Sequence, residues 1–329
     1  MSNKEILFLS SKEIESILTM QDSINAVRSA FINFSQGKAE DPQRISLNLS
    51  NENDEALFMP AYEKDSDFAS LKIVSVFKNN PRFNLPKIQA LIVLIDSNTG
   101  SALSVMDGEY ITSMRTGAAS GLATDLLAKR ESKIAAIIGT GVQAVKQLEA
   151  ISCVRDFDKI YVYGLAIDDA IKFVNENKDK YSFDLFAEEN RNHLEECDII
   201  CTATSSNKPV FRNKNIKDGT HINSIGSYKP DMCEVPEETI LKSKVVVDSI
   251  SACLKEAGDI IQPINKATFS KDNIYAELGE IASGVKKGRE NNKEITVFKS
   301  VGIAIQDLVV ASLVYKKAID MKLGKLVNY

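Results

Sequence analysis

Three cationic residues, Arg44, Lys72 and Arg115, are the first candidates for chemistry in this sequence. Arg115 lies in a run of small residues, which lets a ligand or another surface approach closely, and a planar guanidinium can bind a carboxylate with two hydrogen bonds. Lys72 lies in the apolar segment SLKIVSV, and Arg44 begins a segment with one polar face. The three residues are therefore candidates for holding an acidic ligand. The alternative for each is an ordinary solvated side chain.

A glycine-rich turn is the second candidate. An apolar segment that begins at Lys133 leads into a G-x-G-x-x-A motif at Gly139, Gly141 and Ala144, and a helical pattern follows over residues 142–154. Such glycines permit a tight turn and a close approach of the backbone to a pyrophosphate, which the helix N-terminus then binds. The motif alone is weak, but its place between a strand and a helix favours dinucleotide binding. A triphosphate-binding P-loop is excluded because no Lys-Ser/Thr pair follows, and an S-adenosylmethionine fold remains a minor alternative.

The end of the next predicted strand does not distinguish NAD from NADP. An acid at this position usually binds the ribose 2′-OH, whereas a basic residue accepts a 2′-phosphate. Here Tyr163 is followed by Gly-Leu-Ala, and Asp168 and Asp169 come slightly late. Asp168 could also cap a helix that runs to Asn177. Either cofactor is therefore compatible with the sequence.

The elements that must position these residues fall into two patterns. In the first third of the chain, helical spacing predicts a helix over Met20–Gln36 with Gly37 as its stop, and alternating or short apolar segments predict strands. The predicted strands cover residues 45–49, 56–62, 69–77, 89–95 and 102–105. Because these strands are short and closely spaced, they predict a mostly antiparallel sheet.

The middle of the chain instead alternates strands and helices. Six short apolar segments cover residues 133–138, 159–163, 182–186, 198–203, 221–225 and 244–248. Most gaps between them can hold a helix, which predicts an α/β fold with a parallel, doubly wound sheet of six strands. A long amphipathic helix is predicted over residues 303–323, and we expect it to pack on the first domain.

Composition excludes several classes of protein. The chain has 329 residues, with 40 Lys and Arg against 45 Asp and Glu, so no basic surplus suits nucleic acid. No apolar run approaches the ~20 residues of a membrane span, and the N-terminus does not resemble a secretory signal. Five cysteines without a CxxC pair fit a reducing cytoplasm, and only two histidines are present. We therefore expect a cytoplasmic protein with no metal, membrane or nucleic-acid partner.

The order of longer motifs resembles the ornithine cyclodeaminase/mu-crystallin family. The motifs are VMDGEYITSMRTGAASGLATDLL, KIAAIIGTGVQA, HINSIG, KVVVDS, AELGE and TVFKSVGIAIQD, and together they span nearly the whole chain. The resemblance implies a homodimer. It also implies a substrate-binding and dimerisation domain formed by residues 1–117 and 300–329, together with a Rossmann dinucleotide-binding domain formed by residues 118–299.

The same resemblance implies roles for individual residues. Arg44, Lys72 and Arg115 would hold the substrate carboxylate, with Val301 also at the substrate, and Lys72 and Arg115 would be catalytic. The residues that it places on NAD or NADP are Arg115, Thr116, Gly139, Gly141, Val142, Gln143, Thr202, Ala203, Thr204 and Ser300.

Two departures from the family pattern bear on the substrate. Cyclodeaminases resembling this chain carry a glutamate where Leu57 stands, and an aspartate shortly after HINSIG that is absent here unless Asp231 replaces it. Ornithine cyclisation needs carboxylates to handle the amine, so their loss counts against it. We predict an NAD(P)H-dependent oxidoreductase that reduces a small cyclic imino acid of the pyrroline- or piperideine-2-carboxylate type. The alternatives are ornithine cyclodeaminase, alanine dehydrogenase, and a non-catalytic, crystallin-like protein that binds NAD(P)H.

Overall fold

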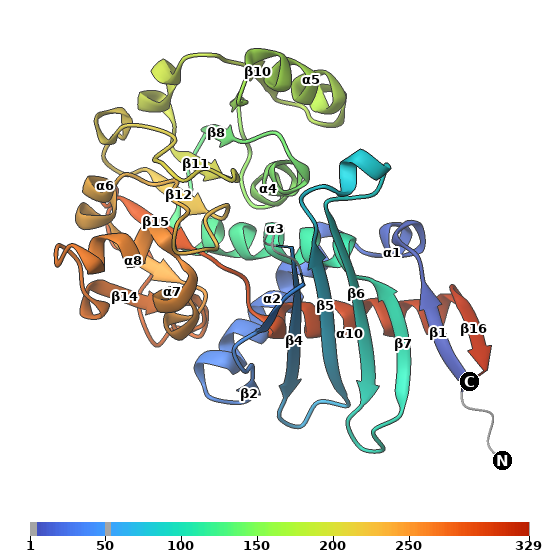
Figure 1. The fold of residues 1–329 in the computed structure, drawn as a ribbon. Helices are drawn as coiled ribbons and strands as arrows, with labels where there is room; N and C mark the ends of the chain where they lie inside the picture. The colour runs from blue at the N-terminus through green and yellow to red at the C-terminus, as the bar shows by residue number, and fades with distance from the viewer. Residues whose placement is uncertain (1–4, 50–53, 329) are drawn as a thin grey trace. The chain divides into compact units, whose positions relative to one another are not determined.

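The computed structural model describes residues 5–49 and 54–328. It divides into two compact units (Figure 1). Unit 1 contains the chain up to Arg115 and from Ile303 onward, and unit 2 is Thr116–Gly302. Helix α3 (Gly108–Leu127) begins in the first unit and ends in the second.

Unit 1 is built on one sheet with the strand order β16-β1-β7-β6-β5-β4-β2, in which β3 also pairs with β4. All pairs are antiparallel except β1 with β7, so the predicted mostly antiparallel sheet is confirmed. Its elements are β1 (Glu5–Leu9), α1 (Ser11–Ile17), α2 (Met20–Ser35), β2 (Ala39–Glu40), β3 (Ile45–Asn48), β4 (Glu55–Glu63), β5 (Phe68–Val76), a 3-10 turn (Asn80–Phe83), β6 (Ile88–Asp96), β7 (Ala102–Asp107), α10 (Ala304–Met321) and β16 (Lys325–Asn328).

Helix α10 covers one face of this sheet, across β4, β5 and β6, and packs on α2 (Figure 1). The period of two in each strand places one set of side chains beneath the helix. In β6 these are Ala90, Ile92 and Leu94, all at most 8% exposed. The predicted helix over residues 303–323 is therefore confirmed, as is its packing on the first domain. Helix α2 ends just before Gly37, whose φ of 70° only glycine adopts without strain.

The opposite face of the sheet is apolar, and no helix within the described residues of unit 1 covers it. Cross-strand pairing places Leu71, Val93, Val105 and Phe8 in one row over four strands. Phe8 is 42% exposed and Leu91, on the same face of β6, is 50% exposed. We call this the open face of the sheet.

Unit 2 is a parallel sheet with the order β10-β9-β8-β11-β12-β15-β13-β14. This order confirms the predicted doubly wound α/β fold. The elements are β8 (Ile134–Ile138), α4 (Val142–Ser152), β9 (Lys159–Tyr163), α5 (Ile167–Asn177), β10 (Asp184–Ala187), β11 (Ile199–Thr202), β12 (His221–Ser224), α6 (Glu237–Lys242), β13 (Lys244–Val247), α7 (Ile250–Glu256), α8 (Gly258–Asn265), β14 (Ile274–Glu277), α9 (Leu278–Ala282) and β15 (Thr296–Lys299), with 3-10 turns at Lys178–Lys180, Arg191–Glu196, Asn213–Asn215 and Lys271–Asn273.

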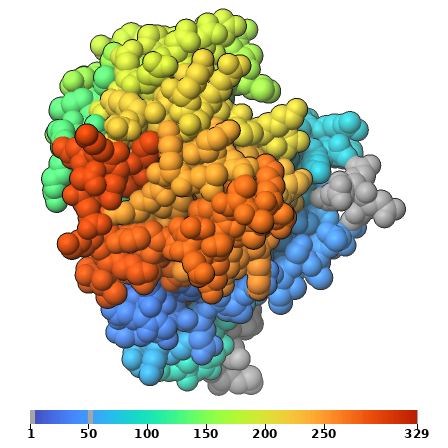
Figure 2. Space-filling model, turned by 90° about the vertical axis from the view of Figure 1, so that its left-hand side faces the viewer, coloured from blue at the N-terminus to red at the C-terminus, as the bar shows by residue number. Residues whose placement is uncertain are grey.

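Each face of the parallel sheet buries its own apolar cluster. Leu148 and Ile151 of α4 and Phe173 of α5 pack on one face. Ile240 of α6 and Ile260 of α8 belong to the cluster on the other. Figure 2 shows the outer surface that α6, α7 and α8 form, in orange. Helices on both faces explain why the strands are apolar on both sides rather than alternating.

Two details of unit 2 correct the sequence prediction. The sheet has two more strands than the predicted six, because β14 and β15 are short and β15 inserts between β12 and β13. Asp168 is not the cap of α5. Ala166 is the N-cap, and its amide donates to the Asp169 carboxylate at 3.1 Å. Within the described part of the chain, no helix is long and apolar enough to cross a membrane.

Candidate active site

Lys72 lies in the centre of the unit 1 sheet, on the face that α10 covers. Its neighbours across the strands are Met59 and Ile92, and it is 1% exposed. Its Nζ donates to Oδ2 of Asp307, in the first turn of α10, at 2.5 Å. The alternative of a solvated strand lysine is therefore wrong.

Arg115 on α3 binds the same carboxylate. Its Nε donates to Oδ1 of Asp307 at 3.0 Å, and its Nη1 donates to Oε1 of Gln306 at 2.8 Å. Gln306 Oε1 also accepts the amide of Ile303, the N-cap of α10, at 3.2 Å. Because Arg115 is only 6% exposed, the alternative of an exposed helical arginine is also wrong.

The Lys72–Arg115–Asp307 cluster carries one more positive than negative charge when all three groups are ionised. Burial lowers the pKa of Lys72 to about 7, with help from Arg115 and Arg44, while Asp307 opposes the shift. Burial alone would raise the pKa of Asp307, but the two cations overcome burial and hold that pKa below its usual value. The cluster therefore suits a ligand with one negative charge.

Arg44 lies between β2 and β3, just before the exposed strand β3, and is partly buried. Its charge is among the causes that lower the pKa of Lys72, so it acts on the same cluster. The nearby N-terminus of α10 is held by Asp41, whose carboxylate accepts the amide of Ala304 at 2.9 Å. The three sequence-predicted cations are thus grouped in unit 1.

The glycine turn of unit 2 has the geometry of a phosphate cradle. Gly139 has φ of 119°, and a Cβ there would lie 2.4 Å from the carbonyl oxygen of Ala203. Among residues 5–49 and 54–328, a Cβ at Gly141 would meet no atom within 4 Å, and no side chain caps the first amides of α4, where Val142 is 72% exposed. An uncapped helix start facing open space fits the pyrophosphate of a dinucleotide. Gln143 lies in the same first turn.

Thr116 and Gly117 place α3 against α4 within unit 2. Thr116 is 7% exposed, and its carbonyl accepts a hydrogen bond from Gln147 at 3.5 Å. A Cβ at Gly117 would lie 2.6 Å from the carbonyl oxygen of Lys146. The small residues of this segment therefore serve a close helix crossing, which was one of the two uses that the sequence allowed.

The predicted cofactor segment Thr202–Thr204 forms the end of β11 and the loop after it. Thr202 is fully buried, and its hydroxyl donates to Glu234 at 2.9 Å. The amide and the hydroxyl of Thr204 donate to the same carboxylate at 2.6 and 2.7 Å. Ala203 abuts the glycine turn, as described above. A buried acid that sequence analysis did not identify thus shapes this segment.

Ser300 and Val301 are fixed in a similar way by Asp248, at the end of β13. One oxygen of the Asp248 carboxylate accepts the Ser300 hydroxyl at 2.7 Å and the amides of Val301 and Gly302 at 2.8 and 2.7 Å. Asp248 and Ser300 are at most 2% exposed. The turn therefore has one backbone conformation that the buried carboxylate holds.

Sequence analysis gave no role to several acids and amides that hold the site residues, among them Asp307, Gln306, Glu234 and Asp248. The available signal for Asp307 was an acid in the first turn of an otherwise apolar helix. Glu234 had no comparable signal, because it lies in a loop between elements. Among the described residues, no group of three or more His, Cys, Asp or Glu side chains could hold a metal ion.

Comparisons with known proteins agree over the whole chain. The family model for the ornithine cyclodeaminase/mu-crystallin family matches residues 4–322. A Delta(1)-pyrroline-2-carboxylate reductase of Bacillus thuringiensis subsp. konkukian is 39% identical over 98% of this chain and 100% of that protein.

Two solved structures are similarly close. The Thermococcus litoralis Delta(1)-pyrroline-2-carboxylate reductase in complex with NADH and L-proline matches with a TM-score of 0.94 and 44% identity, over 97% of this chain and 99% of that one. An archaeal alanine dehydrogenase dimer with bound NAD matches with a TM-score of 0.92 and 36% identity, over 99% of each chain. This chain therefore belongs to the ornithine cyclodeaminase/mu-crystallin family.

Proposed function

We propose that this protein is an NAD(P)H-dependent reductase of a small cyclic imino acid of the pyrroline- or piperideine-2-carboxylate type. The observation that carries the proposal is the buried Lys72–Arg115–Asp307 cluster, whose surplus positive charge matches one carboxylate. The full-length similarity to reductases of this substrate class supports it.

The cluster suits the acid group of the substrate. Within the described residues, Nε and Nη1 of Arg115 have protein partners, whereas Nη2 has none and is free for a ligand. Arg44 adds a second positive charge nearby. In a buried setting, such cations bind a carboxylate strongly and orient the ring that carries it.

The reduction adds a hydride to the ring carbon that bears the carboxylate and a proton to the imine nitrogen, so that the C=N bond becomes a C–N single bond. The dinucleotide, when bound, supplies the hydride. Lys72 can supply the proton, because its pKa of about 7 leaves it able to donate near neutral pH. Asp307 then orients the lysine for the next proton.

The dinucleotide would lie at the carboxyl ends of β8 and β11, beside the glycine turn. Gly139, Gly141, Val142 and Gln143 would hold its pyrophosphate, and residues 202–204 and 300–301 would line it. Thr116 would also contribute. The similar solved structures contain NADH and NAD. Because the end of β9 has no acid at the usual place, both NADH and NADPH need to be tested.

Two family activities are the main rivals. Leu57 is 8% exposed on β4 and offers no acceptor for the side-chain ammonium of ornithine, and Asp231 is exposed, so cyclodeamination is disfavoured. Alanine oxidation is a second candidate, because one of the similar structures is an alanine dehydrogenase.

The deciding experiment measures three reactions side by side: reduction of pyrroline- and piperideine-2-carboxylate, oxidation of alanine, and deamination of ornithine. We expect the imino acids to have the highest kcat/KM. Faster alanine oxidation or ornithine turnover would overturn the proposal. NADH binding without any turnover would favour a crystallin-like binding protein.

We further propose that the protein is a homodimer joined through the open face of the unit 1 sheet. Side chains such as Leu91 and Phe8 leave a large apolar area exposed there, and areas of this kind usually mark an interface. A similar alanine dehydrogenase is a dimer. A cytoplasmic location is proposed as well, since the five cysteines are all free thiols.

A further inference from the structure

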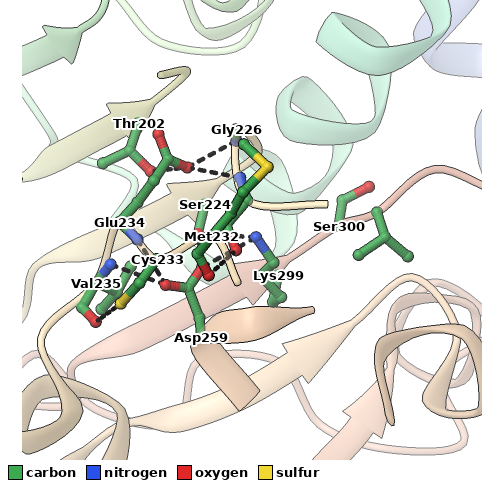
Figure 3. Close-up of polar contacts among 12 residues, drawn as sticks. Thr202, Ser224, Gly226, Met232, Cys233, Glu234, Val235, Asp259, Lys299 and Ser300 are labelled. Atoms are coloured by element: carbon green, nitrogen blue, oxygen red, sulfur yellow. Dashed lines mark hydrogen bonds and ion pairs between the residues drawn. The ribbon is translucent and has the colours of Figure 1, made fainter. Parts of the chain in front are cut away.

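Glu234 occupies an unusual position in unit 2, because one buried carboxylate receives hydrogen bonds from two separate loops. Oε1 accepts the amide and the hydroxyl of Thr204 at 2.6 and 2.7 Å. Oε2 accepts the Thr202 hydroxyl at 2.9 Å and the amides of Gly226 and Ser227 at 2.6 and 3.2 Å. Thr202 ends β11 and Thr204 lies in the loop after it, whereas Gly226 and Ser227 follow β12. Figure 3 shows the side chain reaching between these loops.

A second buried pair fixes the backbone of Glu234. Oδ1 of Asp259 accepts the amides of Glu234 and Val235 at 2.7 and 3.0 Å. Oδ2 of Asp259 lies 3.0 Å from Nζ of Lys299, and both side chains are fully buried (Figure 3). The Ser224 hydroxyl donates to the same oxygen at 2.9 Å. The direction of the Glu234 side chain is therefore set from β12, β15 and α8 together.

The two clamped loops touch each other and the glycine turn. A Cβ at Gly226 would lie 2.0 Å from the carbonyl oxygen of Thr204, so the loops meet backbone to backbone. Ala203, next to Thr204, lies equally close to the glycine turn: a Cβ at Gly139 would be 2.4 Å from the Ala203 carbonyl oxygen. Because Glu234 holds Thr204 and the adjacent Ala203 packs on Gly139, Glu234 also fixes the turn that would bind the pyrophosphate.

We propose that Glu234 is a positioning residue for the dinucleotide: its carboxylate clamps the loops after β11 and β12 in the conformation that the cofactor requires. The inference rests on the proposed function. The Glu234 side chain is fully buried, and its hydrogen-bond partners described above are all residues of the chain. It acts through the loop backbones, so its loss leaves the chain folded with a smaller fraction of molecules ready to bind.

The substitution Glu234→Gln tests the clamp because it preserves shape and changes only the acceptor pattern. Each carboxylate oxygen accepts at least one backbone amide, from Thr204 or from Gly226, and an amide group cannot rotate its proton away as a hydroxyl can. In either orientation, the NH₂ of glutamine faces one of these donors. The amide of Thr204 or that of Gly226 therefore loses its acceptor.

The matched control is Asp198→Asn. Asp198, like Glu234, is a buried acid of unit 2 that accepts backbone amides, from Lys133 at 2.9 Å and Ile134 at 3.3 Å. It precedes β11, at the opposite end of the strand from Thr202. Both substitutions should lower the melting temperature, but only Glu234→Gln removes hydrogen bonds from the loops after β11 and β12, where the cofactor is proposed to bind.

The measurement is the Kd of NADH, or of NADPH if that binds more tightly, by fluorescence titration of the full-length protein. Loss of a charged hydrogen bond is expected to raise the Kd about 10- to 100-fold in Glu234→Gln. Asp198→Asn should stay within about two-fold of the wild type. If Glu234→Gln does not fold, Thr202→Val removes one hydroxyl donor to Glu234 at constant shape and should raise the Kd roughly five-fold. The Thr202 side chain is fully buried, so this loss acts through Glu234 and not through a contact of its hydroxyl with the cofactor.

The outcomes are distinct. An unchanged Kd in Glu234→Gln overturns the proposed positioning role and leaves the proposed function intact. The same holds for an unchanged Kd in Thr202→Val if Glu234→Gln does not fold. Equal weakening in the Asp198→Asn control also overturns it, because the effect would then follow stability alone. Wild-type protein that binds neither dinucleotide refutes the proposed function itself.

Discussion

The two units each bury a cluster of three charged groups, and the clusters have opposite charge surpluses. In unit 1, Lys72 and Arg115 share Asp307, which leaves one positive charge. In unit 2, Lys299 pairs with Asp259 beside Glu234, which leaves one negative charge when all three groups are ionised. Burial raises the pKa of Glu234, while Lys299 and the hydrogen bonds from Thr204 oppose the shift. Burial of an unbalanced charge is costly, so each surplus needs a partner.

The two clusters differ in whether the chain itself supplies the groups that compensate the surplus charge. The chain itself satisfies the negative surplus, because loop amides and hydroxyls donate five hydrogen bonds to Glu234. Among the described residues, Lys72 and Arg115 form ion pairs with Asp307 alone, so no second carboxylate balances the positive surplus of unit 1. We infer that the unit 2 cluster is structural and that the unit 1 cluster binds an anionic substrate.

The largest effect is expected from Arg115→Ala, which removes the surplus charge and the proposed carboxylate ligand. We expect kcat/KM for the imino acid to fall at least ~100-fold, since charged hydrogen bonds to a ligand are lost. Steady-state kinetics measure this. Lys317→Ala is the control, because Lys317 lies on α10, the helix that carries Asp307, and pairs with Asp22 away from the cluster. Unchanged turnover in Arg115→Ala would remove the site assignment.

Next in size is Asp307→Asn, which leaves two buried cations without their carboxylate. Breaking a buried pair in this way typically costs about 3–5 kcal/mol of unfolding free energy. Chemical denaturation should show this loss. An added anion such as sulfate should restore more stability to the variant than to the wild type. Equal responses to the anion would show that the cluster does not attract anions.

The two glycines of the turn should separate folding from cofactor binding. Gly139→Ala forces a Cβ into the carbonyl oxygen of Ala203, so it should lower both the melting temperature and NADH affinity. Gly141→Ala meets nothing within the protein, so it should weaken only NADH binding. Differential scanning fluorimetry and NADH titration on both variants measure this. Loss of stability in Gly141→Ala would contradict the assignment of open space to the cofactor.

A smaller effect is expected from pH. Because the pKa of Lys72 is about 7, the cluster carries its surplus positive charge below that pH and loses it as the lysine deprotonates above it. The KM for the acid substrate should therefore rise by up to about ten-fold per pH unit above pH 7. Lys72→Arg should abolish this rise, because arginine stays protonated. A flat KM profile in the wild type would mean that Lys72 does not titrate in this range.

We expect Leu91→Glu to change kcat/KM least of these variants but to change the oligomeric state. A charge on the open face should convert a dimer into a monomer in light-scattering measurements. Ser16→Glu, on the exposed side of α1, is the control. A dimer that persists in Leu91→Glu would place the interface elsewhere.

Local patterns in the sequence were sufficient for most elements near the site. Period and length predicted α2, α10 and strands β4 to β9, because these segments bury one clear face or both. The cations Lys72 and Arg115 stood out because charges are rare among apolar or small neighbours.

Long-range contacts explain what was missed. The insertion of β15 between β12 and β13 depends on pairing across dozens of residues, and four-residue strands give too little periodicity to recognise. The roles of Asp307 and Glu234 depend equally on partners distant in sequence. Asp307 bonds to Lys72 across 235 positions, so neither its burial nor its charge balance could be inferred locally.

The central claim is that the unit 1 cluster recognises a carboxylate, and substrate comparison tests it most directly. The measurement is the ratio of kcat/KM for pyrroline-2-carboxylate to that for 1-pyrroline, which lacks the acid group, in the wild type and in Arg115→Ala. We predict a ratio well above ~100 in the wild type that collapses in the variant. A ratio that is the same in both proteins would contradict the account.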